Sequence, residues 1–104
     1  MAEYIELNDS NFSSTIAAEN RALVYYYASW CGACRMASSM FKRVATDLNL
    51  TLYKIEAEQN SQARTSVKIE NLPTLALVLD GKIVASLCTT REEGLREFLA
   101  ENGV

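Results

Sequence analysis

Cys31 and Cys34, separated by two residues, are the side chains of this 104-residue sequence best suited to chemistry. A dithiol at this spacing can open a disulfide, because one thiolate attacks a sulfur to form a mixed disulfide and the second thiol then displaces it. The second step is intramolecular and therefore has a large effective concentration. We expect Cys31, at the exposed end of the turn, to attack, and the more buried Cys34 to resolve the intermediate.

The segments on either side of the cysteines predict where the sulfurs lie. Residues 22–28 are apolar and aromatic without polar alternation, as expected for a central strand buried on both faces. Residues 36–48 carry an amphipathic helical pattern, with Met36, Met40 and Val44 four apart on the apolar face. A strand that turns into a helix places both sulfurs near the helix N-terminus, where free backbone N–H groups and the macrodipole favour a thiolate.

A zinc site or a purely structural role could also use a cysteine pair, but both fit this sequence less well. A structural zinc site needs four Cys or His ligands, and the sequence has three cysteines and no histidine, so only a site shared between two chains would suffice. The pair could also be two small core residues. Trp30 before the pair, Gly32 within it and the strand-to-helix junction disfavour that role.

The N-terminal part of the chain predicts one strand and one helix before the central strand. Residues 4–7 alternate weakly and are expected to form a short first strand. Residues 8–11 offer capping oxygens to a helix that places Phe12, Ile16 and Ala17 on one buried face.

The C-terminal half predicts three further strands. Residues 50–56 have the pattern of a strand, after which Asn60 is expected to cap a short helix. Residues 74–79 and 82–87 are strands joined by Asp80-Gly81, a typical two-residue hairpin turn, and should be antiparallel.

A final helix completes the pattern. Residues 90–93 match a capping box, Leu95, Phe98 and Leu99 form the apolar face, and residues 102–103 end the helix. The element order is β-α-β-α-β-α-β-β-α, which predicts an α/β fold with a mostly parallel sheet between two helical layers.

Composition limits the remaining possibilities. The length suits a single domain, 1–104, and the dispersed net charge of −3 argues against nucleic acid or an anionic membrane as a partner. The first residues lack the basic start and apolar core of a signal peptide, and no apolar run is long enough to span a bilayer. An odd number of cysteines suits a cytoplasmic protein with a working dithiol better than a disulfide-stapled secreted domain.

Three motifs together resemble the thioredoxin family: Ala28-Ser29-Trp30-Cys31-Gly32-Ala33-Cys34-Arg35, Leu72-Pro73-Thr74 and Asp80-Gly81. The resemblance spans essentially the whole chain. It implies a thioredoxin fold, with a central five-stranded mixed sheet in the order 1-3-2-4-5 flanked by four helices. It also implies a protein-disulfide reductase without a bound cofactor, which is recharged by an NADPH-dependent thioredoxin reductase and acts on disulfide-containing client proteins.

The same resemblance assigns a substrate-binding surface. The Leu72–Pro73 peptide bond should be cis, which brings Pro73 beside the sulfurs and frees the Leu72 backbone to pair with an extended substrate. Trp30 and Gly32 belong to this surface. Cys88 stands at a family glycine in the loop before the last helix; it is either a redox-regulatory or substrate-contacting thiol, or an inert, partly buried residue.

The sequence departs from the family at several tuning positions. Ala33 replaces a proline between the cysteines, from which we expect a modestly less reducing couple. Ser39 replaces a second proline, so the helix should run straighter. Tyr25 replaces a buried aspartate beneath the cysteines, and a phenol with an ordinary pKa near 10 is a poor base at neutral pH.

Three further expectations concern the surroundings of Tyr25. Its hydroxyl can donate a hydrogen bond to a thiolate. Lys54 matches the family's lysine and is expected to pair with Glu56 on the same face of its strand. Tyr27 stands at a family tryptophan, where it either contacts Glu58 or is simply packed.

Two alternatives to a reductase remain open from the sequence. The same chemistry would serve an oxidase or isomerase, since potentials on this fold vary widely. The chain, which we expect to be a monomer, could also be a binding or scaffold module in which redox chemistry is secondary.

Overall fold

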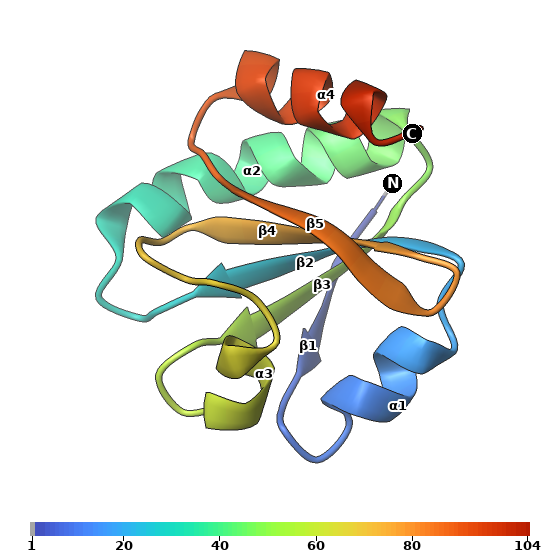
Figure 1. Cartoon of the computed structure of the whole chain (residues 1–104). Coiled ribbons are helices and arrows are strands. Elements are labelled where there is room, and N and C mark those ends of the chain that lie inside the picture. Colours follow the sequence, from blue (N-terminus) through green and yellow to red (C-terminus); the bar gives the residue numbers. More distant parts are fainter. Residues whose placement is uncertain (1) are drawn as a thin grey trace.

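A computed structural model describes residues 2–104, and within them the chain forms five strands and four helices in the expected order (Figure 1). Met1, the first residue of the expected domain, lies outside the described residues. The elements are β1 (Tyr4–Leu7), α1 (Phe12–Ala17), β2 (Arg21–Tyr27), α2 (Gly32–Asp47), β3 (Thr51–Glu56), α3 (Ser61–Thr65), β4 (Thr74–Leu79), β5 (Lys82–Cys88) and α4 (Glu92–Glu101).

The strand order is β1-β3-β2-β4-β5, which confirms the expected order. Strands β1 and β2 both pair with β3 in parallel, whereas β4 is antiparallel to β2 and β5 is antiparallel to β4. The sheet is therefore mixed, which confirms what the resemblance implies, with two parallel and two antiparallel pairings. The mostly parallel sheet predicted from the element order alone was wrong. The reason is that β4 enters from the sheet end where β2 leaves, so the chain reverses direction there.

Two apolar cores lie on opposite faces of the sheet. Helices α2 and α4 cover one face and α1 and α3 the other, as Figure 1 shows. The alternation of side chains along β2 assigns Leu23 and Tyr25 to the first core and Val24 and Tyr26 to the second. A central strand buried on both faces explains why 22–28 lacks polar alternation.

Helix α2 buries most of the expected stripe, including Met40 and Val44. Cys34, Ala37, Phe41 and Val44 face the sheet, at the spacing of one helical face. Met36, expected on this face, is 87% exposed. It follows Cys34 by two positions and therefore points to the opposite side of the helix. Ala17 of α1, also expected to be buried, is exposed.

All three expected helix caps were wrong. Asn11 precedes α1 and Asn60 precedes α3 without capping either helix through its side chain, and the capping box at 90–93 forms no side-chain cap on α4. The carboxylate of Asp9 instead accepts the backbone N–H groups of Gln62 and Ala63 in the first turn of α3. The Asn60 side chain supports this contact, because its oxygen accepts a hydrogen bond from the Asp9 N–H. A tertiary contact thus replaces a local cap.

The expected hairpin turn is present. Asp80 and Gly81 have φ of 51° and 80°, and both left-handed positions suit the two-residue turn between β4 and β5. The turn is held from outside by two hydrogen bonds, from the Asp80 N–H to Asn20 O (2.9 Å) and from the Gly81 N–H to Glu19 O (2.7 Å). A Cβ at Gly81 would lie 2.8 Å from the Ala17 carbonyl oxygen, so glycine is required there.

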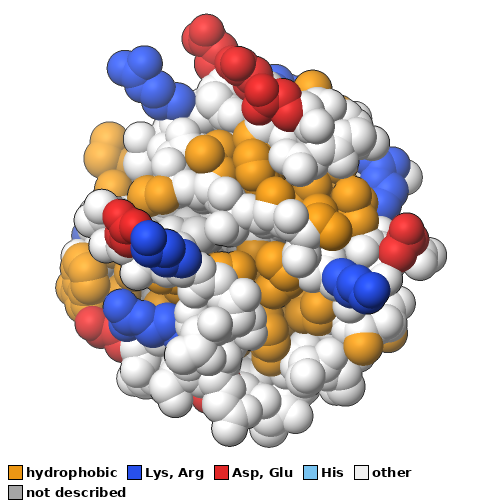
Figure 2. Space-filling model, in the orientation of Figure 1, with side chains coloured by type: hydrophobic (Ala, Val, Ile, Leu, Met, Phe, Trp, Pro, Cys, Tyr) orange, Lys and Arg blue, Asp and Glu red, His pale blue; other side chains and the backbone are white. Residues whose placement is uncertain are grey.

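On the face in Figure 2, positive and negative side chains are interspersed, and apolar atoms are visible between them. No basic stripe runs across the part of the molecule drawn there. No helix in the described chain is both long and apolar enough to cross a bilayer.

Candidate active site

The two cysteines of the motif are joined as a disulfide at the N-terminus of α2. Cys31 is the N-cap residue, and its sulfur accepts a 3.2 Å hydrogen bond from the Cys34 N–H. This places the sulfur where unpaired N–H groups and the helix dipole stabilise negative charge. Cys34 is 1% exposed and Cys31 5%, so the expected ranking holds, although Cys31 is more buried than expected.

The turn between strand and helix is held by backbone groups. The Cys31 N–H donates to Ala28 O (3.1 Å) and the Arg35 N–H donates to Cys31 O (3.3 Å). The Arg35 guanidinium bends back to donate to Ser29 O (3.0 Å). Gly32 and Ala33, between the cysteines, are exposed to solvent.

Strand register brings Pro73 to the same end of the sheet. Thr74 pairs with Tyr26, so the residue before β4 lies next to the point where β2 gives way to the cysteine turn. The Leu72–Pro73 peptide bond is cis, as the resemblance implies, and Pro73 is buried. Within residues 2–104 the backbone of Leu72 receives and donates no hydrogen bond.

Trp30 projects from the turn beside Cys31 and is 65% exposed. Its indole N–H donates a 2.9 Å hydrogen bond to Glu58 Oε1. Of the two alternatives for Tyr27, the contact with Glu58 is therefore wrong: Glu58 accepts the Trp30 indole, and the Tyr27 hydroxyl donates to Glu6. The register of β1 against β3 decides this, since it brings Glu6 to the face on which Tyr27 lies.

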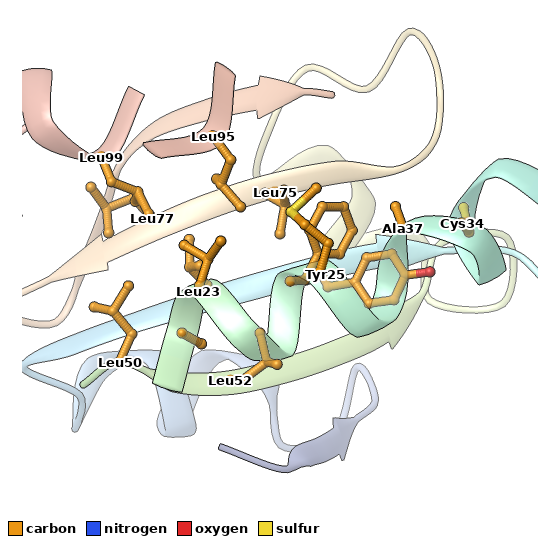
Figure 3. Packing of buried hydrophobic residues seen from close by; sticks show 14 of the residues in the cluster. Leu23, Tyr25, Cys34, Ala37, Leu50, Leu52, Leu75, Leu77, Leu95 and Leu99 are labelled. Carbon is orange, nitrogen blue, oxygen red and sulfur yellow. The ribbon is translucent and has the colours of Figure 1, made fainter. Parts of the chain in front are cut away.

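Tyr25 lies in the buried cluster that contains both cysteines. Figure 3 shows its hydroxyl directed toward the end of this cluster where Cys34 lies. Its ring packs against Phe41, Tyr4 and Tyr27, with centroids 5.1, 5.5 and 5.6 Å apart. Burial raises the pKa of Tyr25 to about 12, so the phenol stays protonated at neutral pH. In the described part of the chain its hydroxyl makes no hydrogen bond to either sulfur.

Lys54 is paired across strands, not along its own strand. Its ammonium nitrogen lies 4.0 Å from Glu6 Oε1 and over the rings of Tyr4 (5.6 Å) and Tyr27 (5.5 Å). The expected pair with Glu56 was wrong, because Glu56 Oε1 accepts the N–H groups of Glu58 and Gln59 in the following loop. Glu6 is thus a site residue that the sequence did not identify. The available signal was its position two residues after Tyr4, on the same face of β1.

Comparison with known proteins identifies the family. The thioredoxin family model matches residues 3–101. The chain belongs to the thioredoxin family. It is 34% identical over 94 residues to the thioredoxin of Chlamydia pneumoniae, and the match covers 89% of this chain and 88% of that protein.

Further relatives differ in length or in sequence. A mitochondrial thioredoxin domain-containing protein of Schizosaccharomyces pombe is 31% identical over 98 residues; the match covers 90% of this chain but only 27% of that longer protein. A chain in the crystal structure of a complex of ferredoxin:thioredoxin reductase with thioredoxin f2 superposes with a TM-score of 0.85 at 17% identity. That match covers 98% of this chain and 96% of the other, and it shows a shared fold.

As a thioredoxin-family member with its cysteine pair at disulfide distance, the protein is a thiol–disulfide oxidoreductase. The thioredoxin fold needs no metal for this chemistry. Among residues 2–104, no three His, Cys, Asp or Glu side chains are grouped as a metal site would require.

Three positions at which the sequence departs from the family are exposed. Ala33 faces solvent between the cysteines, and Ser39 lies on the outer side of α2, which is uninterrupted from Gly32 to Asp47. Cys88 is the last residue of β5, not part of a loop, and it is exposed, not partly buried. It pairs in register with Thr74, which places it next to the Pro73 loop.

Proposed function

We propose that the protein is a protein-disulfide reductase in which Cys31 is the nucleophile and Cys34 the resolving thiol. The Cys31 thiolate forms a bond to one sulfur of a client disulfide, and the other client sulfur leaves as a thiolate that takes up a proton. Cys34 then loses its proton and attacks Cys31 Sγ, which releases the second client sulfur. The client gains two electrons and two protons, and the pair ends as a disulfide.

The observation that carries this proposal is the Cys31 sulfur at the N-cap of α2, where it accepts the Cys34 N–H. A thiolate at that position is stabilised by the helix and is the better attacking group. The more deeply buried Cys34 reaches solvent and clients less easily, which suits a thiol that attacks only the bound intermediate.

Clients would bind on the surface around the disulfide. Trp30 and Gly32 are exposed in the cysteine turn, and the cis Leu72–Pro73 segment at the same end of the sheet would form the other side of this surface. The unpaired backbone of Leu72 offers a hydrogen-bond donor and acceptor to an extended client segment. Cys88 would contact the client beyond that segment.

Trapping with Cys34→Ser tests the assignment. This variant should accumulate mixed disulfides through Cys31, whereas Cys31→Ser should form none. Cys88→Ser is the matched control, because it keeps both thiols of the pair and should accumulate no mixed disulfide. Clients captured through Cys88 instead of Cys31 would overturn the assignment.

The reduction potential tests the direction of the reaction. Because Ala33 restrains the turn less than proline, we expect a value modestly less negative than the value of about −270 mV that is typical of thioredoxin. A value of about −270 mV or lower would contradict this effect of Ala33. One between about −180 and −120 mV would indicate an oxidase or isomerase. A Cys31→Ser protein that keeps its cellular role would indicate a binding module.

The proposed electron donor is an NADPH-dependent thioredoxin reductase. The structural likeness to a chain from a ferredoxin:thioredoxin reductase complex makes the ferredoxin-dependent enzyme the specific competitor. Incubating the oxidised protein with each reductase and its own donor separates them, because only the true partner reduces Cys31–Cys34 at catalytic concentrations.

We further propose that residues 1–104 act as one monomeric domain in the cytoplasm. The free, exposed Cys88 suits a reducing compartment. The open edge strand β5 carries an irregularity opposite Leu77/Val78 and begins with Lys82, features that discourage pairing of edge strands. Size-exclusion chromatography of the reduced protein and localisation of the tagged full chain test these points.

A further inference from the structure

Glu6, Lys54 and Tyr27 form a polar group at the end of the sheet that carries the disulfide. The Lys54 ammonium nitrogen is 4.0 Å from a Glu6 carboxylate oxygen and 5.5 Å from the centre of the Tyr27 ring. The Tyr27 hydroxyl donates a hydrogen bond to the other Glu6 oxygen. The three residues come from β1, β3 and β2, so only the tertiary fold brings them together.

Strand register connects this group to the active site. Glu6 pairs with Lys54, and Lys54 pairs with Tyr25, so the three side chains form a row on the face covered by α2. Tyr25 belongs to the buried cluster with both cysteines, and its ring packs 5.6 Å from the ring of Tyr27, over which the Lys54 ammonium lies. Its phenol is neutral, and Thr74 is the only buried polar side chain in the described chain, so no buried carboxylate opposes Lys54.

We propose that Glu6 is a positioning residue that sets the acidity of the active-site thiols by neutralising Lys54. An unpaired ammonium near the disulfide would stabilise a thiolate, and the Glu6 carboxylate cancels part of that effect. Tyr27 fixes the carboxylate in place through its hydroxyl. The inference rests on the proposed function and deepens it, since thiol acidity determines how fast the dithiol reacts.

Glu6 is the carboxylate that pairs with Lys54, because the other charged groups nearby are engaged elsewhere. Glu56 is bound to backbone N–H groups of the next loop. On α2, Lys42 is paired with Glu3 at 2.9 Å. The remaining titratable groups facing Lys54 are phenols, contributed by Tyr4 on β1 and by Tyr25 and Tyr27 on β2.

The test is a pH titration of thiolate absorbance in the reduced protein, with Cys88→Ser as the background so that only Cys31 and Cys34 report. Glu6→Gln keeps an oxygen for the Tyr27 hydroxyl but removes the charge. At pH values below the midpoint of the thiolate titration, Glu6→Gln should raise the fraction of thiolate on the order of twofold. Lys54→Gln should lower that fraction by a similar factor. The effect should weaken at high salt because the pair is partly exposed.

The double variant Glu6→Gln/Lys54→Gln tests whether the shift caused by Glu6→Gln requires the charge of Lys54. It should titrate close to the wild type, since both charges are gone. Glu3→Gln is the matched control, because it breaks another ion pair of the N-terminal segment, with Lys42, and should leave the titration unchanged. A Glu6→Gln shift no larger than the control, or a double variant that simply repeats Glu6→Gln, would overturn the proposal. The titration needs no client, so its failure would leave the trapping result for Cys34→Ser intact.

Discussion

Glu58 accepts the indole hydrogen bond of Trp30 at 2.9 Å, and this contact connects the residue before Cys31 to the loop after β3. The loop is itself braced, because Glu56 accepts the N–H groups of Glu58 and Gln59. Trp30 is 65% exposed and would otherwise move freely. The hydrogen bond therefore orients a large apolar side chain on the proposed client surface.

Breaking this contact should loosen Trp30. Glu58→Ala removes the acceptor, so the indole should become more mobile and client reduction should slow by a few-fold, as expected for loss of one charge-assisted hydrogen bond of about 1.5–3 kcal/mol, partly screened by solvent. Trp30 is the only tryptophan, so fluorescence anisotropy reports on it directly. Glu58→Gln keeps an acceptor and should stay near wild type. Equal anisotropy in all three proteins would contradict the proposed orienting role.

Replacing Tyr25 should change proton transfer. Burial raises the pKa of its phenol to about 12, so it cannot accept a proton from Cys34 near neutral pH. Tyr25→Asp introduces a carboxylate at the same place and should speed resolution of a preformed mixed disulfide, measured by rapid mixing near pH 7. Tyr25→Phe keeps the ring and should match wild type. Unchanged or slower resolution in the aspartate variant would show that proton removal from Cys34 does not limit this step.

The same aspartate variant should be less stable. Tyr25 packs its ring against three other aromatic rings, and each such pair contributes about 0.5–1.5 kcal/mol beyond its buried area. Denaturant unfolding should show the loss in Tyr25→Asp and not in Tyr25→Phe. An aspartate variant as stable as wild type would show that the ring contacts contribute little.

The β4–β5 turn should not tolerate a side chain at Gly81. Gly81→Ala combines φ of 80° with a Cβ 2.8 Å from the Ala17 carbonyl oxygen. We expect a loss of about 1–3 kcal/mol in unfolding free energy, measured by denaturant titration. Gly32→Ala is the control, since a Cβ there meets nothing within 4 Å and the position lies in a helix. Similar losses in both variants would refute the steric cause.

The Glu92 carboxylate should make the free energy of unfolding depend on pH in the acidic range. Hydrogen bonds from Arg43, and then from Arg96, lower the pKa of Glu92 below its ordinary value of 4.5. The native state therefore binds this proton less readily than the unfolded state, so the contribution is present above pH 4.5 and is lost as the pH falls through the native pKa. The stability difference between wild type and Glu92→Gln should accordingly shrink in acid.

The comparison variant for this effect is Glu97→Gln. Glu97 is exposed on the same helix and forms no ion pair within residues 2–104. Its stability difference from wild type should stay flat across the same pH range. If the stability difference between wild type and Glu92→Gln also stays constant with pH, solvent screening makes the arginine contacts of Glu92 too weak to affect stability.

Local patterns predicted most of the scaffold. The Cys31/Cys34 spacing, the strand before it and the helix after it place the disulfide, and Asp80-Gly81 defines the last turn. These features depend on residues close in sequence, whose backbone preferences and side-chain periodicity act before any tertiary contact forms. The strand order and the cis Leu72–Pro73 bond came instead from the family resemblance, and both are observed.

The polar partners of the site were decided only by the tertiary structure. The sequence placed Lys54 beside Glu56 and left Tyr27 either in contact with Glu58 or simply packed. The structure pairs Lys54 and Tyr27 with Glu6, and Glu58 accepts the hydrogen bond of Trp30. A carboxylate on a flexible side chain accepts whichever donors the fold brings within reach. Which donors those are depends on parallel strand register and on loops between distant elements, and neither is encoded in local spacing.

The helix caps show the same limit. Asparagine and threonine stand at the right local positions, yet Asp9, more than fifty residues earlier in the chain, caps α3. The sequence by itself thus determined the reacting cysteines and the elements that present them. The tertiary structure decided which charges and hydrogen bonds surround them, because those interactions join segments that only folding brings together.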